Sequence, residues 1–183
     1  MTDEKKEVVF ELHTISRVAL VGFIAVHILY LGLFMLLWGS KGIWKELLDF
    51  SEWFLWAFIP SIILHEGIHG LVWAIPANWR HIRFGINRQL MAPYTHCKIP
   101  LRKVHYLAGG LLPGILMGIL PAIYGLVTGQ VQVLFWGIIY TWTAAGDFIS
   151  CWYILKEPAG TMILDHPEEL GYYVMRNPAD RKR

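Results

Sequence analysis

The chain has 183 residues, of which 55% are hydrophobic and 16% are charged, and its formal net charge is +2. The charged residues gather in blocks between long apolar runs, which is typical of a protein embedded in a membrane. The near balance of charge gives no basis for nucleic-acid binding, and the apolar runs leave no length for a separate soluble domain. We therefore expect one membrane-embedded domain over residues 1–183.

Four apolar runs are each long enough to cross the hydrocarbon core of a bilayer as a helix. They cover about 18–38, 54–77, 104–127 and 131–155. The sequence thus predicts an all-α polytopic membrane protein with four transmembrane helices. No small-residue cleavage signature follows the first run, so we interpret it as a retained helix. Residues 39–53 mix large apolar side chains with charges, which predicts a short helix at the outer membrane interface.

The loop 78–103, between the second and third runs, carries a different pattern. Ile82, Phe84 and Ile86 alternate with other residues, and a second extended stretch covers 94–99. Alternation with a period of two is typical of β-strands. We therefore expect a small β-hairpin here, at the cytoplasmic surface of the membrane.

The orientation follows from the basic residues. Every Lys and Arg except Lys41 and Lys45 lies before the first run, in the loop 78–103 or after the fourth run. The positive-inside rule then predicts that both termini and this loop are cytoplasmic. We expect a multi-pass protein of a bacterial cell membrane, with Cys97 and Cys151 as free thiols in or near a reducing compartment.

The second apolar run contains an HExxH sequence formed by His65, Glu66 and His69. Two histidines four residues apart lie on one face of a helix and can both bind zinc, while the glutamate acts as general base. These three are the only ionisable side chains of the run, and such groups are costly inside a membrane unless they serve a function. A solvated helix face, the alternative, is not available here. The sequence therefore predicts a Zn²⁺ site with His65 and His69 as ligands and Glu66 as catalytic residue.

A catalytic zinc site needs a third protein ligand. Asp147 is the only charged residue of the fourth run, and counting along the helices places it within one to two helical turns of the depth of the two histidines. We expect Asp147 to be this ligand. The alternative is a helix cap or a polar tether between helices.

These residues resemble the site-2 protease class of intramembrane zinc metalloproteases, and in particular a small group of zincin-like membrane peptidases of about this length. The resemblance covers about 54–155, and it implies that His65, His69 and Asp147 bind zinc. The hairpin resembles the membrane-associated sheet of that class, and Leu107 to Pro113 resembles the Ala-Gly-Pro segment that opens its next helix. The asparagine that follows this segment in the class is absent here.

The predicted function is hydrolysis of a peptide bond in or near a transmembrane segment of a membrane protein. Such a substrate must unwind locally, and the edge of the hairpin can pair with the exposed backbone by strand addition. We expect Asn87 and Gly85 to contribute to substrate binding. The expected partners are a transmembrane helix and the lipid bilayer.

His27, Asp165 and Glu168 are further residues of types that can bind a metal. His27 lies in the first run at a depth comparable to the motif, although a lone histidine in a membrane more often bonds a backbone carbonyl. Asp165 and Glu168, with Pro167 between them, have the spacing of a helix start, which favours capping.

Two alternatives to the protease stay open. One is a non-proteolytic membrane metal-binding protein or a pseudoprotease that binds transmembrane helices, which would use the histidines without Glu66 as a base. The other is a small ion transporter with Asp147 and His27 on its path, although the four spans show no repeated halves.

Overall fold

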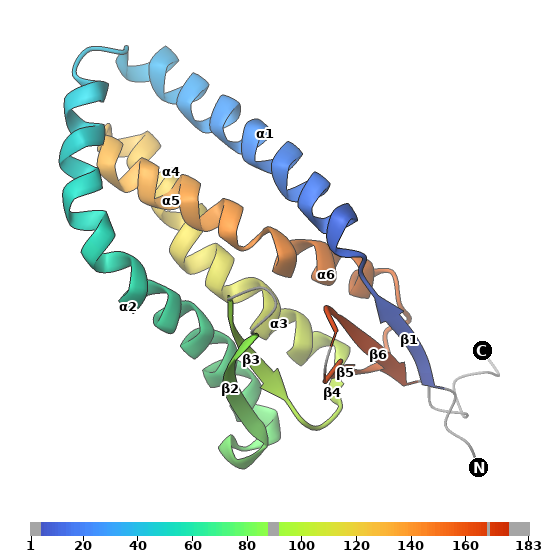
Figure 1. Cartoon of the computed structure of the whole chain (residues 1–183). Coiled ribbons are helices and arrows are strands. Elements are labelled where there is room, and N and C mark those ends of the chain that lie inside the picture. Colours follow the sequence, from blue (N-terminus) through green and yellow to red (C-terminus); the bar gives the residue numbers. More distant parts are fainter. Residues whose placement is uncertain (1–4, 88–91, 168, 176–183) are drawn as a thin grey trace.

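The computed structural model describes residues 5–87, 92–167 and 169–175. The protein is mostly helical, with helices that run back and forth along one axis and two small sheets at one end (Figure 1). The helical elements are α1 (Leu12–Trp38), α2 (Ile43–Ala77), the short η1 (Trp79–His81), α3 (Lys103–Pro113), the π-helical turn η2 (Gly114–Ile119), α4 (Leu120–Thr128), α5 (Val131–Thr143) and α6 (Ala145–Leu155). The strands are β1 (Lys5–Val9), β2 (Ile82–Asn87), β3 (Ala92–Cys97), β4 (Leu101–Arg102), β5 (Met162–Asp165) and β6 (Gly171–Met175).

Three helical stretches among the described residues are long and apolar enough to cross a membrane. They are His13–Trp38, Ile43–Ala77 and Lys103–Thr128, the last of which joins α3, η2 and α4. The fourth expected span, 131–155, consists instead of two shorter helices, α5 and α6, on either side of Ala144. A fourth membrane crossing therefore stays a prediction.

The expected separate helix over 39–53 is wrong as an independent element. The chain turns at Gly39 and Gly42, which both have positive φ angles, and α2 then begins at Ile43 and continues without a break to Ala77. No residue between Trp44 and Phe54 forbids helical geometry, so the amphipathic start and the apolar run form one helix.

The mostly helical fold expected from the sequence is confirmed, but the fold is not all-α apart from the hairpin, because a four-stranded sheet joins the two ends of the described chain. Its order is β1-β6-β5-β4 with antiparallel pairing throughout. Side chains of β5 alternate between half-buried and buried, the period of a strand, so the helix start expected at Asp165 is also wrong. Glu168, the other residue of that expectation, lies outside the described residues.

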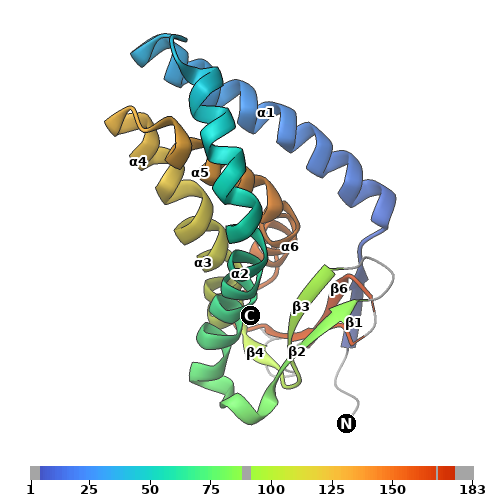
Figure 2. The same ribbon diagram turned by 60° about the vertical axis from the view of Figure 1, so that its left-hand side comes forward.

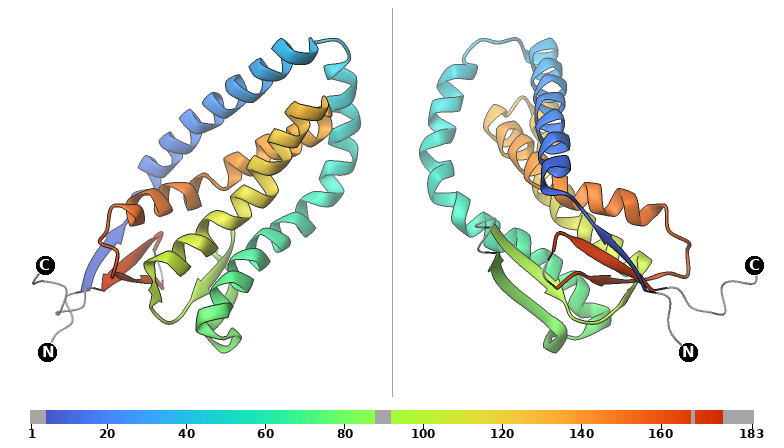
Figure 3. Two further views of the ribbon diagram at one scale, coloured as in Figure 1. Left: turned by 180° about the vertical axis from the view of Figure 1, so that it is seen from behind. Right: turned by 45° about the vertical axis from the view of Figure 1, so that its right-hand side comes forward.

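The predicted hairpin is present. Strands β2 and β3 pair from Ile82↔Cys97 to Asn87↔Ala92, so the second strand lies two residues earlier than the expected 94–99. Hairpin and sheet lie at the same end of the helices, as the turned views show (Figures 2 and 3). Because β1 and β6 belong to one sheet, both ends of the described chain lie at this end.

Two apolar clusters lie along the helices. One includes Phe34, Phe50 and Leu134 near the loops between α1 and α2 and between α4 and α5. The other includes Trp73 and Tyr106 and packs the helices onto the sheet end. Close helix contact depends on glycines, since a Cβ at Gly118 would meet the backbone of Thr141.

Candidate metal centre

The HExxH residues His65, Glu66 and His69 lie in the C-terminal half of helix α2. His65 and His69 are buried on one face, one helical turn apart, and Glu66 is half-buried beside them. This face is turned toward α3 and α6, because α2 packs on α3 over this region and His65 contacts Asp147.

Asp147 lies in the first turn of α6, directly after the break that divides α5 from α6. Near this break the hydroxyls of Thr141 and Thr143 hydrogen-bond the carbonyl oxygens of Gly137 and Tyr140, a side-chain competition with the helical backbone that bends helices. A carboxylate in the first turn is stabilised by the helix dipole. The break therefore gives Asp147 a favourable position opposite α2.

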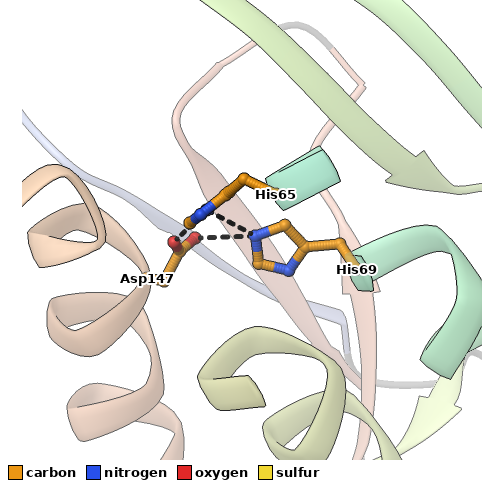
Figure 4. Close-up of side chains that lie close together, drawn as sticks. All are labelled: His65, His69 and Asp147. Carbon is orange, nitrogen blue, oxygen red and sulfur yellow. Dashed lines mark hydrogen bonds and ion pairs between the residues drawn. The ribbon is translucent and has the colours of Figure 1, made fainter. Parts of the chain in front are cut away.

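The three side chains meet (Figure 4). Nε2 of His65 lies 3.2 Å from Oδ2 of Asp147 and 3.2 Å from Nε2 of His69, and Nε2 of His69 lies 3.6 Å from Oδ1 of Asp147. Among the described residues this is the one group of three His, Cys, Asp or Glu side chains whose ligand atoms all lie within 4.8 Å of one another.

The spacing of these atoms suits a zinc ion. Bonds of about 2.0–2.2 Å in tetrahedral geometry place neighbouring ligand atoms roughly 3.3 Å apart. The separation of 3.2 Å between the two Nε2 atoms and that of 3.2 Å between Nε2 of His65 and Oδ2 of Asp147 are close to that value, and the second carboxylate oxygen, Oδ1, lies 3.6 Å from Nε2 of His69. The two histidine side chains are 11% and 6% exposed and the Asp147 side chain is 30% exposed, so the site is open on the side of the carboxylate. Two imidazoles and one carboxylate that leave a position open are the donor set of a catalytic zinc site.

The ring of His69 is held from behind by α3. Its Nδ1 lies 2.9 Å from the carbonyl oxygen of Gly109, an interaction that fixes Nε2 toward His65 and Asp147. The ring also stacks on Trp73 at 5.3 Å, and Trp73 stacks on Tyr106 at 5.1 Å and donates its indole N–H to the Tyr106 carbonyl at 3.2 Å. Trp73 fits against Gly109 so closely that a Cβ there would overlap the indole.

A cavity of about 240 Å³ adjoins the centre on the side of Glu66. It is lined by His65 and Glu66 together with the following residues of α2, β3 and α5: Phe58, Ile62, Pro93, Tyr140 and Thr143. A second cavity of about 240 Å³ is lined by Asp147, Trp73 and Tyr106 and by β3 and the turn between β5 and β6. Pro93 lines both cavities, so β3 runs past the centre from one to the other.

One edge of β3 is free of strand partners among the described residues, and the hydrogen bonds show which backbone groups lie on it. The N–H of Lys98 bonds the carbonyl of His81, on the β2 side, whereas the N–H of Cys97 bonds Asp165, on the other side. Backbone groups alternate along a strand, so Thr95 and Pro93 share the free edge with Cys97. The Thr95 hydroxyl also donates to the carbonyl of Glu66 at 2.8 Å, which fixes β3 against the motif helix.

The other candidates lie elsewhere. His27, on α1, places Nδ1 2.8 Å from the carbonyl oxygen of Phe23 and does not belong to the triad. Gly85 and Asn87 lie on β2, the strand behind β3, and their role in substrate binding stays a prediction. Cys97 and Cys151 are free cysteines, both buried.

A family model described as "Putative zincin peptidase" matches residues 58–162, more than half of the chain. The chain belongs to this family. The matched region contains the HExxH residues of α2 and Asp147 of α6. Membership in the zincin family implies a zinc-dependent metallopeptidase. No curated protein and no solved structure matches the chain.

The residues that surround and orient the three candidate ligands could not all be identified from the sequence. Gly109 acts through a backbone carbonyl, which no sequence pattern marks, and the local spacing of Asp165 predicts a cap although the residue ends a strand. Trp73 did have a signal, since it follows His69 by four residues and therefore lies on the same helical face.

Proposed function

We propose that this zincin is an intramembrane zinc metalloprotease of the site-2 protease type, which hydrolyses a peptide bond in or near a transmembrane segment of a membrane protein. The observation that carries the proposal is the triangle of His65, His69 and Asp147 with Glu66 beside it, built on apolar helices. Ionisable groups at such positions are costly to maintain without a function.

In this proposal His65, His69 and Asp147 hold the metal. When bound, zinc would supply the acidity that lowers the pKa of an attacking water and would polarise the carbonyl of the bond to be cut. Glu66 lies in the wall of the cavity that adjoins the centre, together with His65. Its carboxylate accepts the proton of the attacking water and can return it to the leaving amine. The Gly109 carbonyl holds His69 in the orientation that this chemistry needs.

The surroundings of the centre suit an extended peptide. The cavity on the Glu66 side is walled largely by apolar side chains such as Phe58 and Ile62, which suits a segment that comes from a membrane helix. A locally unwound segment has unpaired backbone groups, and the free edge of β3 offers the N–H and carbonyl of Thr95 and the carbonyl of Pro93. Strand addition at this edge, with Gly85 and Asn87 supporting β3 from the neighbouring strand, is the proposed mode of capture.

We further propose that the hairpin, the sheet and both termini lie in the cytoplasm of a bacterial cell, with four crossings of the bilayer made by α1, α2, the α3–α4 stretch and the α5–α6 pair. Support comes from the basic residues, since Arg80, Arg83 and Lys98 lie exposed at the sheet end. Lys41 and Lys45 lie at the other end.

The decisive experiment compares the purified wild type with Glu66→Gln. Zinc content is measured on both proteins, and cleavage is followed by mass spectrometry on a set of synthetic single-span peptides in detergent micelles. We expect about one zinc per chain in both, and cleavage by the wild type that falls roughly 10²–10⁴-fold in the variant. Zinc in both without cleavage in either would favour the non-proteolytic metal-binding alternative. A wild type that binds no zinc would overturn the proposed centre.

A further inference from the structure

Asp165, the last residue of β5, lies where the four-stranded sheet meets the hairpin. Its Oδ2 accepts a hydrogen bond from the backbone N–H of Cys97 at 2.7 Å, and its Oδ1 accepts one from the hydroxyl of Tyr106. Nδ1 of His96 lies 3.7 Å from Oδ2. The residue is only 8% exposed, and a carboxylate is stable at such a position when its oxygens are bonded in this way. One side chain therefore ties β3 to α3.

The contact with Cys97 occupies a backbone group on the free edge of β3. The next groups on the same edge belong to Thr95 and Pro93, and both residues line the cavity that also contains Asp147 and Asp165. Proline has no N–H, so these two residues offer one N–H, that of Thr95, and two carbonyls. A peptide strand that extended past Thr95 would need the position that the carboxylate of Asp165 fills.

We propose that Asp165 is a positioning residue that closes the free edge of β3 at Cys97 and thereby fixes the register of a peptide strand docked at Thr95. The inference rests on the proposed function, since it takes an extended peptide beside β3 as the substrate. A docked strand that keeps its side chains on the same faces can slip only by two residues. Because the N–H of Cys97 already bonds Asp165, a docked strand cannot shift by two residues along β3 toward Cys97.

The same carboxylate is connected to the metal centre. Tyr106, which it bonds, stacks on Trp73, and Trp73 stacks on His69. The stop on the strand edge and one metal ligand therefore belong to one packed group of side chains. This arrangement keeps a constant distance between the position where the peptide is stopped and the position where it is cut.

The first test uses peptide hydroxamates, in which a zinc-binding group is joined to an extended apolar peptide lengthened one residue at a time on either side. Binding to the zinc-loaded proteins is measured by titration. In the wild type we expect affinity to rise with length and to reach a plateau where the peptide meets Asp165. In the double variant Asp165→Ala/Tyr106→Phe, which removes both partners of the buried hydrogen bond, two further residues should raise affinity about 2- to 10-fold.

Two matched variants separate positioning from general stability. Asp165→Asn keeps an oxygen that can accept the Cys97 N–H, and Tyr106→Phe keeps the carboxylate, so both should keep the wild-type plateau. With a single-span peptide that the wild type cuts, the double variant should give an additional product displaced by two residues. Weaker binding at every length, with an unchanged plateau and cleavage site, would show a merely structural role and overturn the proposal.

A third measurement needs only the wild type, in case the double variant does not fold. Single N-methyl groups are placed along the hydroxamate peptide, and each removes one N–H. We expect two sensitive positions, two residues apart, for the carbonyls of Thr95 and Pro93. A third sensitive position two residues further on would show that the edge at Cys97 is open and would overturn the register stop alone. If the zinc-loaded wild type binds none of these peptides, the proposed peptide docking itself fails.

Discussion

Nδ1 of His69 lies 2.9 Å from the carbonyl oxygen of Gly109, so the proposed metal ligand on α2 is oriented by the backbone of α3. The approach is possible because residue 109 has no side chain, and Trp73 occupies the space where one would be. The indole in turn stacks on the His69 ring. The centre therefore depends on a glycine that holds no metal.

Gly109→Ala should weaken zinc binding, because the new methyl group would displace Trp73 and with it the support of His69. Loss of a group that orients a ligand lowers metal affinity by about 10- to 100-fold, and we expect a loss in this range. Competition with a chelator of known affinity measures it. Gly146→Ala is the matched control, since a Cβ there meets nothing within 4 Å although the residue adjoins Asp147. Equal affinity in the two variants would contradict the role assigned to Gly109.

Asp147→Ala should lower zinc content about as much as His69→Ala, because each change removes one of three protein ligands. The loss should exceed the roughly 100-fold that marks the upper range for supporting groups. Zinc is measured after dialysis against a weak chelator. His27→Ala is the control and should keep wild-type zinc, since His27 interacts with the Phe23 carbonyl. Full zinc occupancy in Asp147→Ala would remove this residue from the ligand set.

The cytoplasmic location of the hairpin is testable with an introduced thiol. The natural Cys97 is a poor reporter, because it is 1% exposed and burial raises the pKa of its thiol, which leaves little reactive thiolate at neutral pH. Arg83→Cys in a background with Cys97→Ser and Cys151→Ser places a thiol on the exposed face of β2. A membrane-impermeant maleimide should label it only after the membrane is opened. Lys41→Cys, at the other end, should be labelled in intact cells, and the reverse pattern would invert the topology.

Gly85→Pro should cripple cleavage of a single-span peptide and leave zinc bound. Gly85 pairs with Tyr94, and the alternation of hydrogen bonds along β3 makes this a bonded pair, so proline would remove a bond that holds β3 in place. Ile86→Pro is the matched control, because the N–H of Ile86 points away from β3. Cleavage rates of the purified variants are compared at equal zinc content. Wild-type cleavage by Gly85→Pro would exclude the hairpin from substrate capture, and loss of zinc would make it a support of the centre.

The three side chains of the candidate metal centre could be predicted from the sequence, because the prediction depends on short, regular spacings. The helical period places His65 and His69 on one face, and Asp147 is conspicuous because a lone charge in an apolar run is costly. Counting residues along helices of fixed rise was enough to predict that Asp147 approaches them, and the structure brings the three together. The alternation at Ile82, Phe84 and Ile86 likewise predicted the hairpin.

Features that depend on contacts distant in sequence were decided only by the tertiary structure. Asp165 has the local spacing of a helix cap, yet it ends a strand, because pairing with β4 and β6 outweighs a weak local preference. The strand that lies beside the centre is β3, whereas the residues predicted from the sequence to bind substrate, Gly85 and Asn87, lie on β2. Alternation of apolar residues indicates that a segment is a strand, but it does not indicate which strand of a hairpin lies next to the site. The division of the fourth apolar run at Ala144 could not be predicted from the sequence either. Composition gives the length of an apolar segment, but it does not show where packing and threonine hydroxyls interrupt its helix.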